Sequence, residues 1–404
     1  MAKTATVVED SNRPGPAPEG VENWIVGPDS DVTPAVSVVM PTMNEEEGIA
    51  ECISRIKRAV AELRVPTEII ISDSSTDRTP EVASELGAVV VEPDKMGYGY
   101  AYRCAFEHTR GGYIVMGDAD TTYDFEQIPR LIEHLEETDA DIVMGSRLDG
   151  EIKPGAMPPL HQYVGNPLLT RFLNVFYDAG VSDAHSGFRV LRRGVLDDLD
   201  FECDGMEFAS EMVMKAGADG LTISEVPITY HEREGEATLD SFRDGWRHVR
   251  FMLVNAPGYL FSLPAFAFGF VGIMILSLSS FDGQLPGVAV GVHTALMGSL
   301  LAIVGFQVGS LTVFSAITAD PIQAPSDAIT RWIRRSVRLE HGATAGLGFC
   351  MIGAAYLTVR WITGSTGEAF VNVPNIFAFT AVVIGIQTVF SSFFLSMVKT
   401  RTDH

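Results

Sequence analysis

Four long apolar stretches close to the C-terminal end constrain the fold of this chain more than any other feature. They cover approximately residues 259–279, 288–317, 343–362 and 376–398. Each is near or above the ~20 residues that a helix needs to cross the hydrocarbon core of a bilayer. We therefore predict an all-α membrane domain of four transmembrane helices over residues 258–404, with the lipid bilayer as a partner.

The charges that flank these stretches predict their orientation. Four arginines lie between the second and third stretches, and Lys399 and Arg401 follow the fourth, whereas the other two loops carry Asp282 and Glu368. Loops rich in lysine and arginine stay on the cytosolic side of a membrane. We therefore expect a multi-pass protein of the cell membrane, with both termini and the N-terminal domain in the cytosol.

The overall charge is strongly negative. The chain carries 52 acidic and 29 basic side chains, a formal net charge of -23. A surface this negative repels nucleic acid, so we expect no nucleic-acid partner. Lysine is rare, with only six residues in the chain. This composition is typical of a halophilic protein, because concentrated salt screens crowded acidic charges; an ordinary acidic protein is the alternative.

The first 34 residues differ in composition from the rest of the chain. They are rich in proline, glycine and acidic residues, and they lack the apolar core of a signal peptide. Such a composition does not bury enough apolar surface to fold. We predict a flexible acidic tail over residues 1–34 and a folded domain over residues 35–238.

The folded domain alternates short apolar runs with amphipathic segments. The apolar runs cover residues 36–40, 68–72, 88–91, 113–116 and 142–145. Between the first two, Ile49, Ile53, Ile56, Val60 and Leu63 recur at helical spacing. Short strands separated by helices indicate an α/β fold with a mainly parallel sheet. Such sheets bind ligands at the carboxyl ends of their strands.

Residues 239–257 form a third kind of segment. Phe242, Trp246, Val249 and Leu253 lie on one stripe of a predicted helix, and arginines occupy an adjoining stripe. This pattern predicts an amphipathic interfacial helix just before the first apolar stretch. A helix packed on the folded domain is the alternative.

The most informative motif is Asp118-Ala119-Asp120, which follows the apolar run that begins at Tyr113. Magnesium prefers oxygen ligands and is commonly held by one or two carboxylates together with substrate phosphates. Asp118 and Asp120 are therefore predicted to bind a divalent cation, Mg²⁺ or Mn²⁺, beside a nucleoside diphosphate. Arg147 and Arg233 are expected to grip phosphates, because guanidinium groups match phosphate oxygens and stay charged; a surface ion pair is the alternative for each.

Five further motifs occur along the same part of the sequence. They are Pro41-Thr42-x-Asn44-Glu45, Glu68-Ile-Ile-Ile71-Ser-Asp73, Gly145-Ser-Arg147, Asp183-Ala-His-Ser186-Gly-Phe-Arg189 and Glu225-Val-Pro-Ile-Thr-Tyr-His-Glu-Arg233. Together, over about residues 35–251, they resemble family 2 glycosyltransferases of the dolichyl-phosphate or polyprenyl-phosphate hexose synthase type, such as dolichol-phosphate glucose and mannose synthases.

The resemblance implies a GT-A fold, a Rossmann-like, parallel-rich sheet with flanking helices, and three groups of site residues. The catalytic group is Asp118, Asp120, Arg147 and Arg233. The nucleotide-sugar group is Pro41, Thr42, Met43, Asn44, Glu45, Ile71, Asp73, Asp118, Ala119, Asp120 and Glu207. The lipid-phosphate group is Arg147, His161, Ser186, Arg189 and Arg233.

The resemblance also implies a reaction. One hexose would move with inversion from a nucleotide sugar, UDP-glucose being favoured over GDP-mannose, to dolichyl or polyprenyl phosphate at the cytosolic face, for protein glycosylation. Two positions depart from the mannosyl pattern. Thr122 stands where a glutamine ligand of the metal is common, and Gly235-Glu-Ala-Thr238 lacks the lysine of many relatives.

Other functions remain open. A processive polysaccharide synthase would carry Gln-x-x-Arg-Trp, but neither Arg331-Trp332 nor Arg360-Trp361 has a glutamine at that spacing. A membrane sugar-binding scaffold is the non-enzyme alternative, against which the intact Asp118-x-Asp120 motif argues. The sequence leaves a homo-oligomer open.

Overall fold

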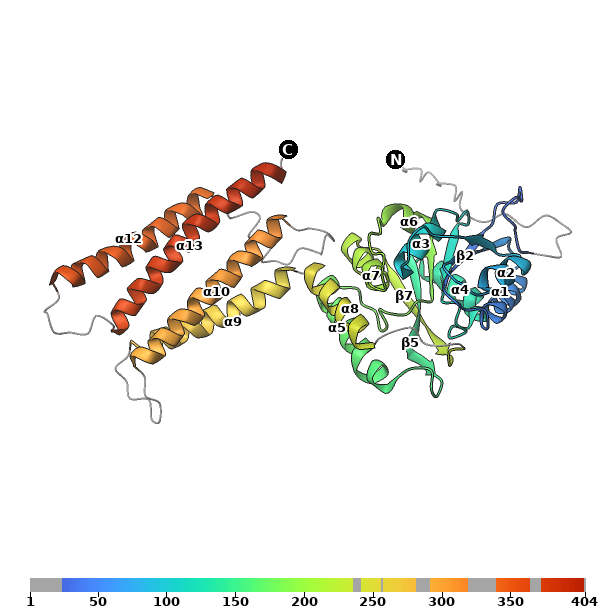
Figure 1. Cartoon of the computed structure of the whole chain (residues 1–404), viewed down its shortest axis with the longest axis horizontal. Helices are drawn as coiled ribbons and strands as arrows, with labels where there is room; N and C mark the ends of the chain where they lie inside the picture. Colours follow the sequence, from blue (N-terminus) through green and yellow to red (C-terminus); the bar gives the residue numbers. More distant parts are fainter. Residues whose placement is uncertain are drawn as a thin grey trace, which may run out of the picture. The chain divides into compact units, whose positions relative to one another are not determined.

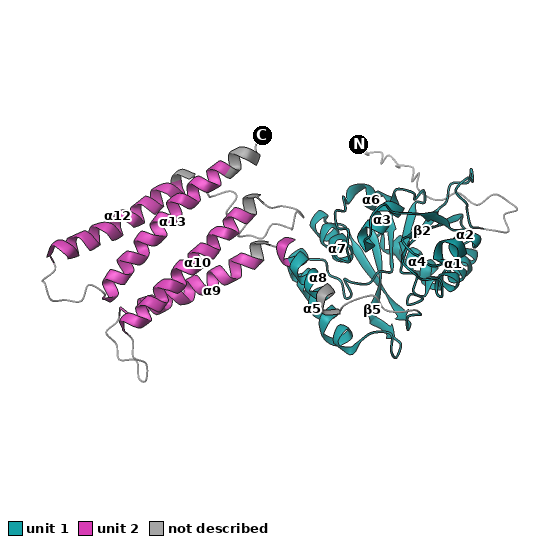
Figure 2. Ribbon diagram, in the orientation of Figure 1, with its two compact units in different colours: residues 1–252 teal, residues 253–404 magenta. Residues whose placement is uncertain are grey.

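The structure is a computed structural model, and it describes residues 24–234, 241–255, 257–280, 291–318, 339–363 and 372–402. The chain divides into two compact units, residues 1–252 and 253–404 (Figure 2). Each unit is a separate body with its own secondary structure: unit 1 combines a sheet with helices, and unit 2 is helical.

Unit 1 is built on a seven-stranded sheet within residues 24–234, with the order β3-β2-β1-β4-β6-β5-β7 (Figure 1). The strands are β1 (Val36–Thr42), β2 (Thr67–Asp73), β3 (Val89–Val91), β4 (Tyr113–Met116), β5 (Ile142–Ile152), β6 (Arg189–Arg192) and β7 (Ile223–Tyr230). Within this sheet only β6 runs antiparallel to its neighbours β4 and β5. The predicted strands are confirmed, and the sheet is mainly parallel as predicted, with β6 as the antiparallel exception.

Helices flank this sheet. They are α1 (Ile49–Leu63), α2 (Thr79–Glu85), α3 (Tyr98–Phe106), η1 (Phe125–Gln127), α4 (Ile128–Thr138), η2 (His161–Gly165), α5 (Asn166–Tyr177), α6 (Arg193–Asp198), α7 (Phe208–Asp219) and α8 (Ser241–Asn255). The apolar spacing of α1 predicted its inner face correctly, because Ile49, Ile53, Ile56 and Val60 are all buried in the core.

Asparagine is a common helix N-cap, but Gly48 precedes α1 and Asn44 instead adopts a left-handed conformation with φ 59°. The predicted tail also ends earlier than residue 34. The Thr67 carbonyl accepts from Val26 at 2.8 Å, and the Thr67 N–H donates to the Trp24 carbonyl, so residues 24–26 pair with the start of β2.

Helix α8 has an inner face and an outer face. His248 hydrogen-bonds within unit 1 and Met252 is completely buried. Trp246 is 60% exposed and Val254 is 57% exposed. The packed face supports the alternative of a helix held on the folded domain, whereas the exposed tryptophan leaves the interfacial role as a prediction. The side chain of Phe242 lies outside the described residues.

Unit 2 contains α9 (Pro257–Leu278), α10 (Val292–Thr318), α12 (Leu339–Thr363) and α13 (Val373–Thr402). In the described part of the chain four helices are long and apolar enough to cross a membrane: Leu260–Leu278, Val292–Ser315, His341–Thr363 and Val373–Met397. The four predicted stretches are confirmed as helices. The predicted loop arginines, Asp282 and Glu368 lie outside the described residues.

Small residues allow these helices to approach closely in pairs. A Cβ added to Gly305 of α10 would lie 2.3 Å from the backbone nitrogen of Gly269 in α9. A Cβ added to Gly346 of α12 would lie 2.7 Å from the carbonyl oxygen of Gly385 in α13. Close backbone contact of this kind is the usual way in which membrane helices associate.

Candidate functional site

The predicted motifs meet at one edge of the sheet. Strands β1, β2, β4, β5 and β7 all run in the same direction, so their carboxyl ends lie along the same edge. Asp73 ends β2, Asp118 and Asp120 follow β4, and Arg233 follows β7. This edge is where open α/β sheets bind ligands.

Asp118 is held by an aromatic side chain and a glycine. Tyr98 Oη, at the start of α3, donates a hydrogen bond of 2.8 Å to Asp118 Oδ1. A Cβ on Gly187 would lie 3.0 Å from Asp118 Oδ2 and 3.2 Å from Tyr98 Oη. The carboxylate therefore sits in a close-fitting cradle, and a side chain larger than that of glycine at position 187 would press on it.

Asp120 is 9% exposed and connects two further motifs. Its Oδ1 accepts from Thr122 Oγ1 at 2.5 Å, and its Oδ2 lies 3.5 Å from Arg233 Nη1. The other terminal nitrogen of Arg233 donates to Glu45 Oε1 at 2.5 Å. The Arg233 guanidinium thus bridges the motif after β4 and the motif after β1.

The electrostatics of this group are unbalanced. Burial, and then the charge of Asp120, raise the pKa of Asp118 to about 6, although Tyr98 and two arginines oppose the shift. Burial likewise raises the pKa of Glu45 to about 7, against the attraction of Arg233 and with help from Asp120 and Asp118. Three carboxyl groups therefore outnumber the two guanidinium groups near them, of which Arg147 is already paired with Asp183, and this favours the arrival of further positive charge.

The ends of β1 and β2 form a second polar group beside the first. Asp73 Oδ1 accepts from Thr42 Oγ1 at 2.7 Å and from Ser75 Oγ at 2.6 Å. Asn44 Oδ1 accepts from the Thr76 backbone at 2.9 Å. Pro41 lies near the end of β1, and the half-exposed Met43 follows it in the loop that these contacts order. Ile71 does not fit the predicted nucleotide contact, because its side chain is fully buried in the core.

Arg147 is less available than predicted. It is 7% exposed, and its guanidinium forms a bidentate ion pair with the fully buried Asp183 at 2.7 and 2.9 Å. It also lies over the ring of Tyr230, 5.3 Å from the ring centroid. The charge of Asp183 raises the pKa of Arg147 well above its ordinary value despite burial. A phosphate would have to share this guanidinium with Asp183.

The structure does not support two predicted phosphate ligands. Arg189 is 1% exposed, and its Nε and Nη2 donate to the carbonyls of Ser186, Ala184 and Ala209. Ser186 is completely buried as well. Arg189 begins β6, which lies between β4 and β5 in the sheet, and Ser186 lies in the loop just before this strand. They are better explained as parts of the frame that holds the loop before β6.

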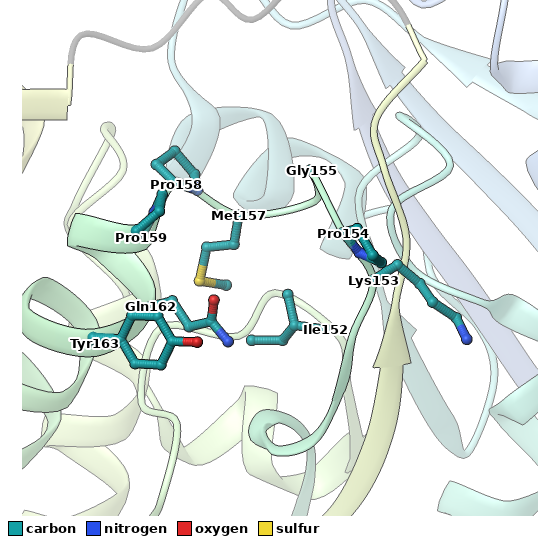
Figure 3. Close-up of a pocket in the computed structure, with 9 residues that line it drawn as sticks. All are labelled: Ile152, Lys153, Pro154, Gly155, Met157, Pro158, Pro159, Gln162 and Tyr163. Carbon is teal, nitrogen blue, oxygen red and sulfur yellow. The ribbon is translucent and has the colours of Figure 1, made fainter.

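The two remaining predicted residues, Glu207 and His161, have other neighbours in the structure. Glu207 precedes α7, and its Oε1 lies 3.7 Å from Arg247 Nε of α8. His161 begins η2, beside a cavity of about 540 Å³ lined by residues of segments 152–159 and 162–163. In Figure 3, Met157, Gln162 and Ile152 point toward one another and Lys153 points away from them.

Sequence reasoning did not identify Tyr98, Gly187 or Asp183 as parts of the site. Asp183 and Gly187 belong to a motif that contributes to the family resemblance. Their contacts with Arg147 and Asp118 form only when the chain folds. Tyr98 gave no signal, because an aromatic residue at a helix start is ordinarily a core residue. Its position beside the Asp118 carboxylate is visible only in three dimensions.

Comparison with known proteins assigns the family. Residues 37–200 match the glycosyl transferase family 2 model, and residues 316–399 match the family 2 C-terminal transmembrane region. The chain is 54% identical over 377 residues to the low-salt glycan biosynthesis hexosyltransferase Agl6 of Haloferax volcanii, covering 93% of this chain and 91% of that protein. The chain belongs to glycosyl transferase family 2.

Two further proteins are similar to this family 2 glycosyltransferase. The dolichyl-phosphate hexose transferase of Haloferax volcanii is 35% identical, over 52% of this chain and 89% of that protein. The crystal structure of mannosyl-3-phosphoglycerate synthase from Rubrobacter xylanophilus is 23% identical, over 54% of this chain and 73% of that chain, with a TM-score of 0.45.

These comparisons confirm several predictions. The chain is a glycosyltransferase with a GT-A-like mixed sheet and flanking helices, and it is a membrane protein. The Haloferax source of its relatives agrees with the halophilic interpretation of its acidic composition.

Proposed function

We propose that this glycosyltransferase moves one hexose from a nucleotide sugar, UDP-glucose in preference to GDP-mannose, to dolichyl or polyprenyl phosphate. The product is a lipid-phosphate-linked sugar for glycan assembly. The observation that carries the proposal is the group formed by Asp118, Asp120, Glu45 and Arg233 at the carboxyl edge of the sheet. It places carboxylates for a cation next to a guanidinium for phosphate.

The residues present fit a divalent cation. Asp118 and Asp120 offer carboxylate oxygens, and the pKa of Asp118 is raised by burial and then by the charge of Asp120, both of which a bound cation would counter. Among the described residues, no three His, Cys, Asp or Glu side chains are placed to hold a metal by themselves. Two protein carboxylates completed by substrate phosphates and water are a common arrangement for Mg²⁺. When bound, the cation would supply Lewis-acid stabilisation of the leaving diphosphate.

The chain's own residues would hold the donor at both ends. The Thr42–Asp73–Ser75 group after β1 and β2 offers polar contacts to the base and ribose. Arg233 would contact the diphosphate, because its guanidinium is partly exposed and already faces Asp120. Arg147 would contact an acceptor phosphate only from the side that Asp183 leaves open.

The transfer itself needs no general base. One oxygen of the lipid phosphate, already an anion near neutral pH, forms a bond to the anomeric carbon of the sugar. The bond from that carbon to the nucleoside diphosphate breaks, and the diphosphate leaves with the electron pair. A single displacement of this kind inverts the configuration at the sugar carbon.

The acceptor and its location also belong to the proposal. A related protein is named a dolichyl-phosphate hexose transferase, and four apolar helices follow the catalytic unit. A lipid phosphate at the cytosolic face suits both facts. The distribution of charge around the apolar stretches supports a cytosolic catalytic domain with both termini on that side.

A transfer assay tests the proposal. Membranes containing the full chain are incubated with labelled UDP-glucose, a divalent cation and dolichyl phosphate. We expect a product that is extracted into organic solvent and released by mild acid, and we expect Asp120→Ala to abolish it. Equal activity of Asp120→Ala would refute the assigned site. Transfer from GDP-mannose but not from UDP-glucose would show that GDP-mannose is the donor. A labelled polymer would indicate a processive synthase.

A further inference from the structure

A chain of three side chains links the helix before the first apolar span to the loop beside Asp118. Ser210 Oγ, on α7, lies 3.2 Å from His185 Nε2 and 3.1 Å from His248 Nδ1 of α8. The two imidazole rings meet edge to face, with their centroids 5.1 Å apart. None of these three residues is needed by the reaction described above.

The numbers of donors and acceptors on these three side chains determine the direction of their hydrogen bonds. One hydroxyl has a single proton, so it can donate to only one of two ring nitrogens and must accept from the other. His185 Nδ1 is buried without a partner in the described part of the chain. An unpaired buried N–H is rarer than an unpaired acceptor. His185 therefore carries its proton on Nε2 and donates to Ser210, which in turn donates to His248.

The loop that contains His185 also contacts the candidate site. Asp183, two residues before His185, is the partner of Arg147 at 2.7 Å. Gly187, two residues after it, is the residue whose Cβ would lie 3.0 Å from Asp118 Oδ2. A shift of the turn at His185 would move both contacts together.

The helix at the other end is firmly seated in unit 1. Met252 is completely buried one turn beyond His248. Arg247 approaches Glu207 at 3.7 Å, and Glu207 and Ser210 lie on one face of the same turn because they are three residues apart. Two adjacent residues of α8 thus contact one face of α7, and the Ser210 contact continues to the loop.

We propose that His248 is a positioning residue, which acts through Ser210 and His185 to hold the loop 183–187 in place for transfer. This inference rests on the proposed function, because it takes Asp118 and Arg147 as parts of the working site. It makes the segment immediately before the first apolar span a support of the catalytic loop as well as a connection.

The test compares variants of the full chain in membranes by kcat/KM for hexose transfer. His248→Phe keeps the ring volume without nitrogens, Ser210→Ala removes the bridge, and His248→Asn restores a polar atom close to the position of Nδ1. We expect His248→Phe and Ser210→Ala each to lower kcat/KM about tenfold, and His248→Asn to recover most of the loss. The kcat/KM of the double variant is expected to be no lower than that of either single variant, because each variant interrupts the same series of hydrogen bonds.

His108→Phe is the matched control, since this exposed histidine bonds to the Cys104 carbonyl at 2.9 Å, four residues away in the chain. Additive losses in the double variant, no recovery with His248→Asn, or an equal loss in His108→Phe would overturn the inference. Wild-type activity of both His248→Phe and Ser210→Ala would overturn it as well. Failure of the wild-type chain to transfer any hexose to a lipid phosphate would instead refute the proposed function.

Discussion

Tyr98 donates a hydrogen bond of 2.8 Å to Asp118, although the two residues lie 20 positions apart in the chain. The tyrosine ring also packs edge to face on Tyr102, with the centroids 5.1 Å apart. The hydroxyl therefore aims one oxygen of Asp118 while the ring is fixed by its neighbour. This relationship makes Tyr98 part of the candidate site.

Replacing Tyr98 by phenylalanine keeps the packing and removes the hydrogen bond. We expect the KM for the nucleotide sugar to rise about tenfold, because a hydrogen bond to a charged group contributes roughly 1.5–3 kcal/mol. Initial rates at varied donor concentration measure this. Tyr100→Phe is the control, since Tyr100 lies in the same helix and bonds to the exposed Asp94; the same KM for both variants would contradict the role of Tyr98.

Arg233→Lys tests the bridge between Glu45 and Asp120. A lysine has one point charge and cannot contact both carboxylates with separate nitrogens of a planar fork. We expect kcat/KM to fall at least about tenfold, corresponding to about 1.4 kcal/mol. Arg58→Lys, which changes an exposed pair with Glu126, should leave the rate unchanged. An unaltered rate in Arg233→Lys would show that the fork is dispensable.

Asp183→Asn tests the buried pair with Arg147. The change leaves a buried guanidinium without its counter-charge, and breaking such a pair typically costs about 3–5 kcal/mol. We expect a clearly lower midpoint of thermal unfolding of unit 1 in the full chain. Asp139→Asn breaks the pair of Arg192 with an almost fully exposed aspartate, so its midpoint should hardly move. Equal midpoints for the two variants would argue against a stabilising role.

The stability of unit 1 should fall in mild acid because of His185. Burial, and then the charge of His248, lower the pKa of His185 from 6.5 to about 3. Above pH 6.5 the ring is neutral in both states and has no effect. Between these values the unfolded chain binds a proton that the folded chain excludes, so the free energy of unfolding decreases as the pH falls.

Thermal unfolding of the wild-type chain and His185→Gln between pH 7.5 and pH 5 measures this contribution. The midpoint of the variant should depend less on pH than that of the wild type. Parallel curves would mean that other groups cause the acid sensitivity. Because both chains carry the same carboxylates, the difference between their curves isolates the histidine.

The sequence predicted those features that depend on local spacing. The helix over Ile49–Leu63 could be predicted because its buried residues recur every three or four positions. Asp118 and Asp120 could be placed at the sheet edge because they follow a buried strand directly. The four apolar helices could be predicted from length and hydropathy alone.

The features that escaped prediction depend on contacts between distant segments. Strand β6 has only four residues and an arginine at each end, so no apolar alternation marked it. The resemblance of its motif implies a phosphate-binding role for Arg189, whereas β6 places this residue inside the sheet, where it is 1% exposed. The ion pair of Arg147 with Asp183 joins residues 36 positions apart, and no local pattern reveals that such a partner exists.

The glycine contacts in unit 2 bear on how that unit assembles. They close α9 against α10 and α12 against α13, whereas the hydrogen bond of 2.6 Å between Ser299 and Thr380 joins α10 to α13. Each hairpin therefore has its own complementary surface before the other hairpin is made. During synthesis we expect α9 and α10 to associate first and to form a stable helix pair in the bilayer. The pair α12 and α13 then packs against it.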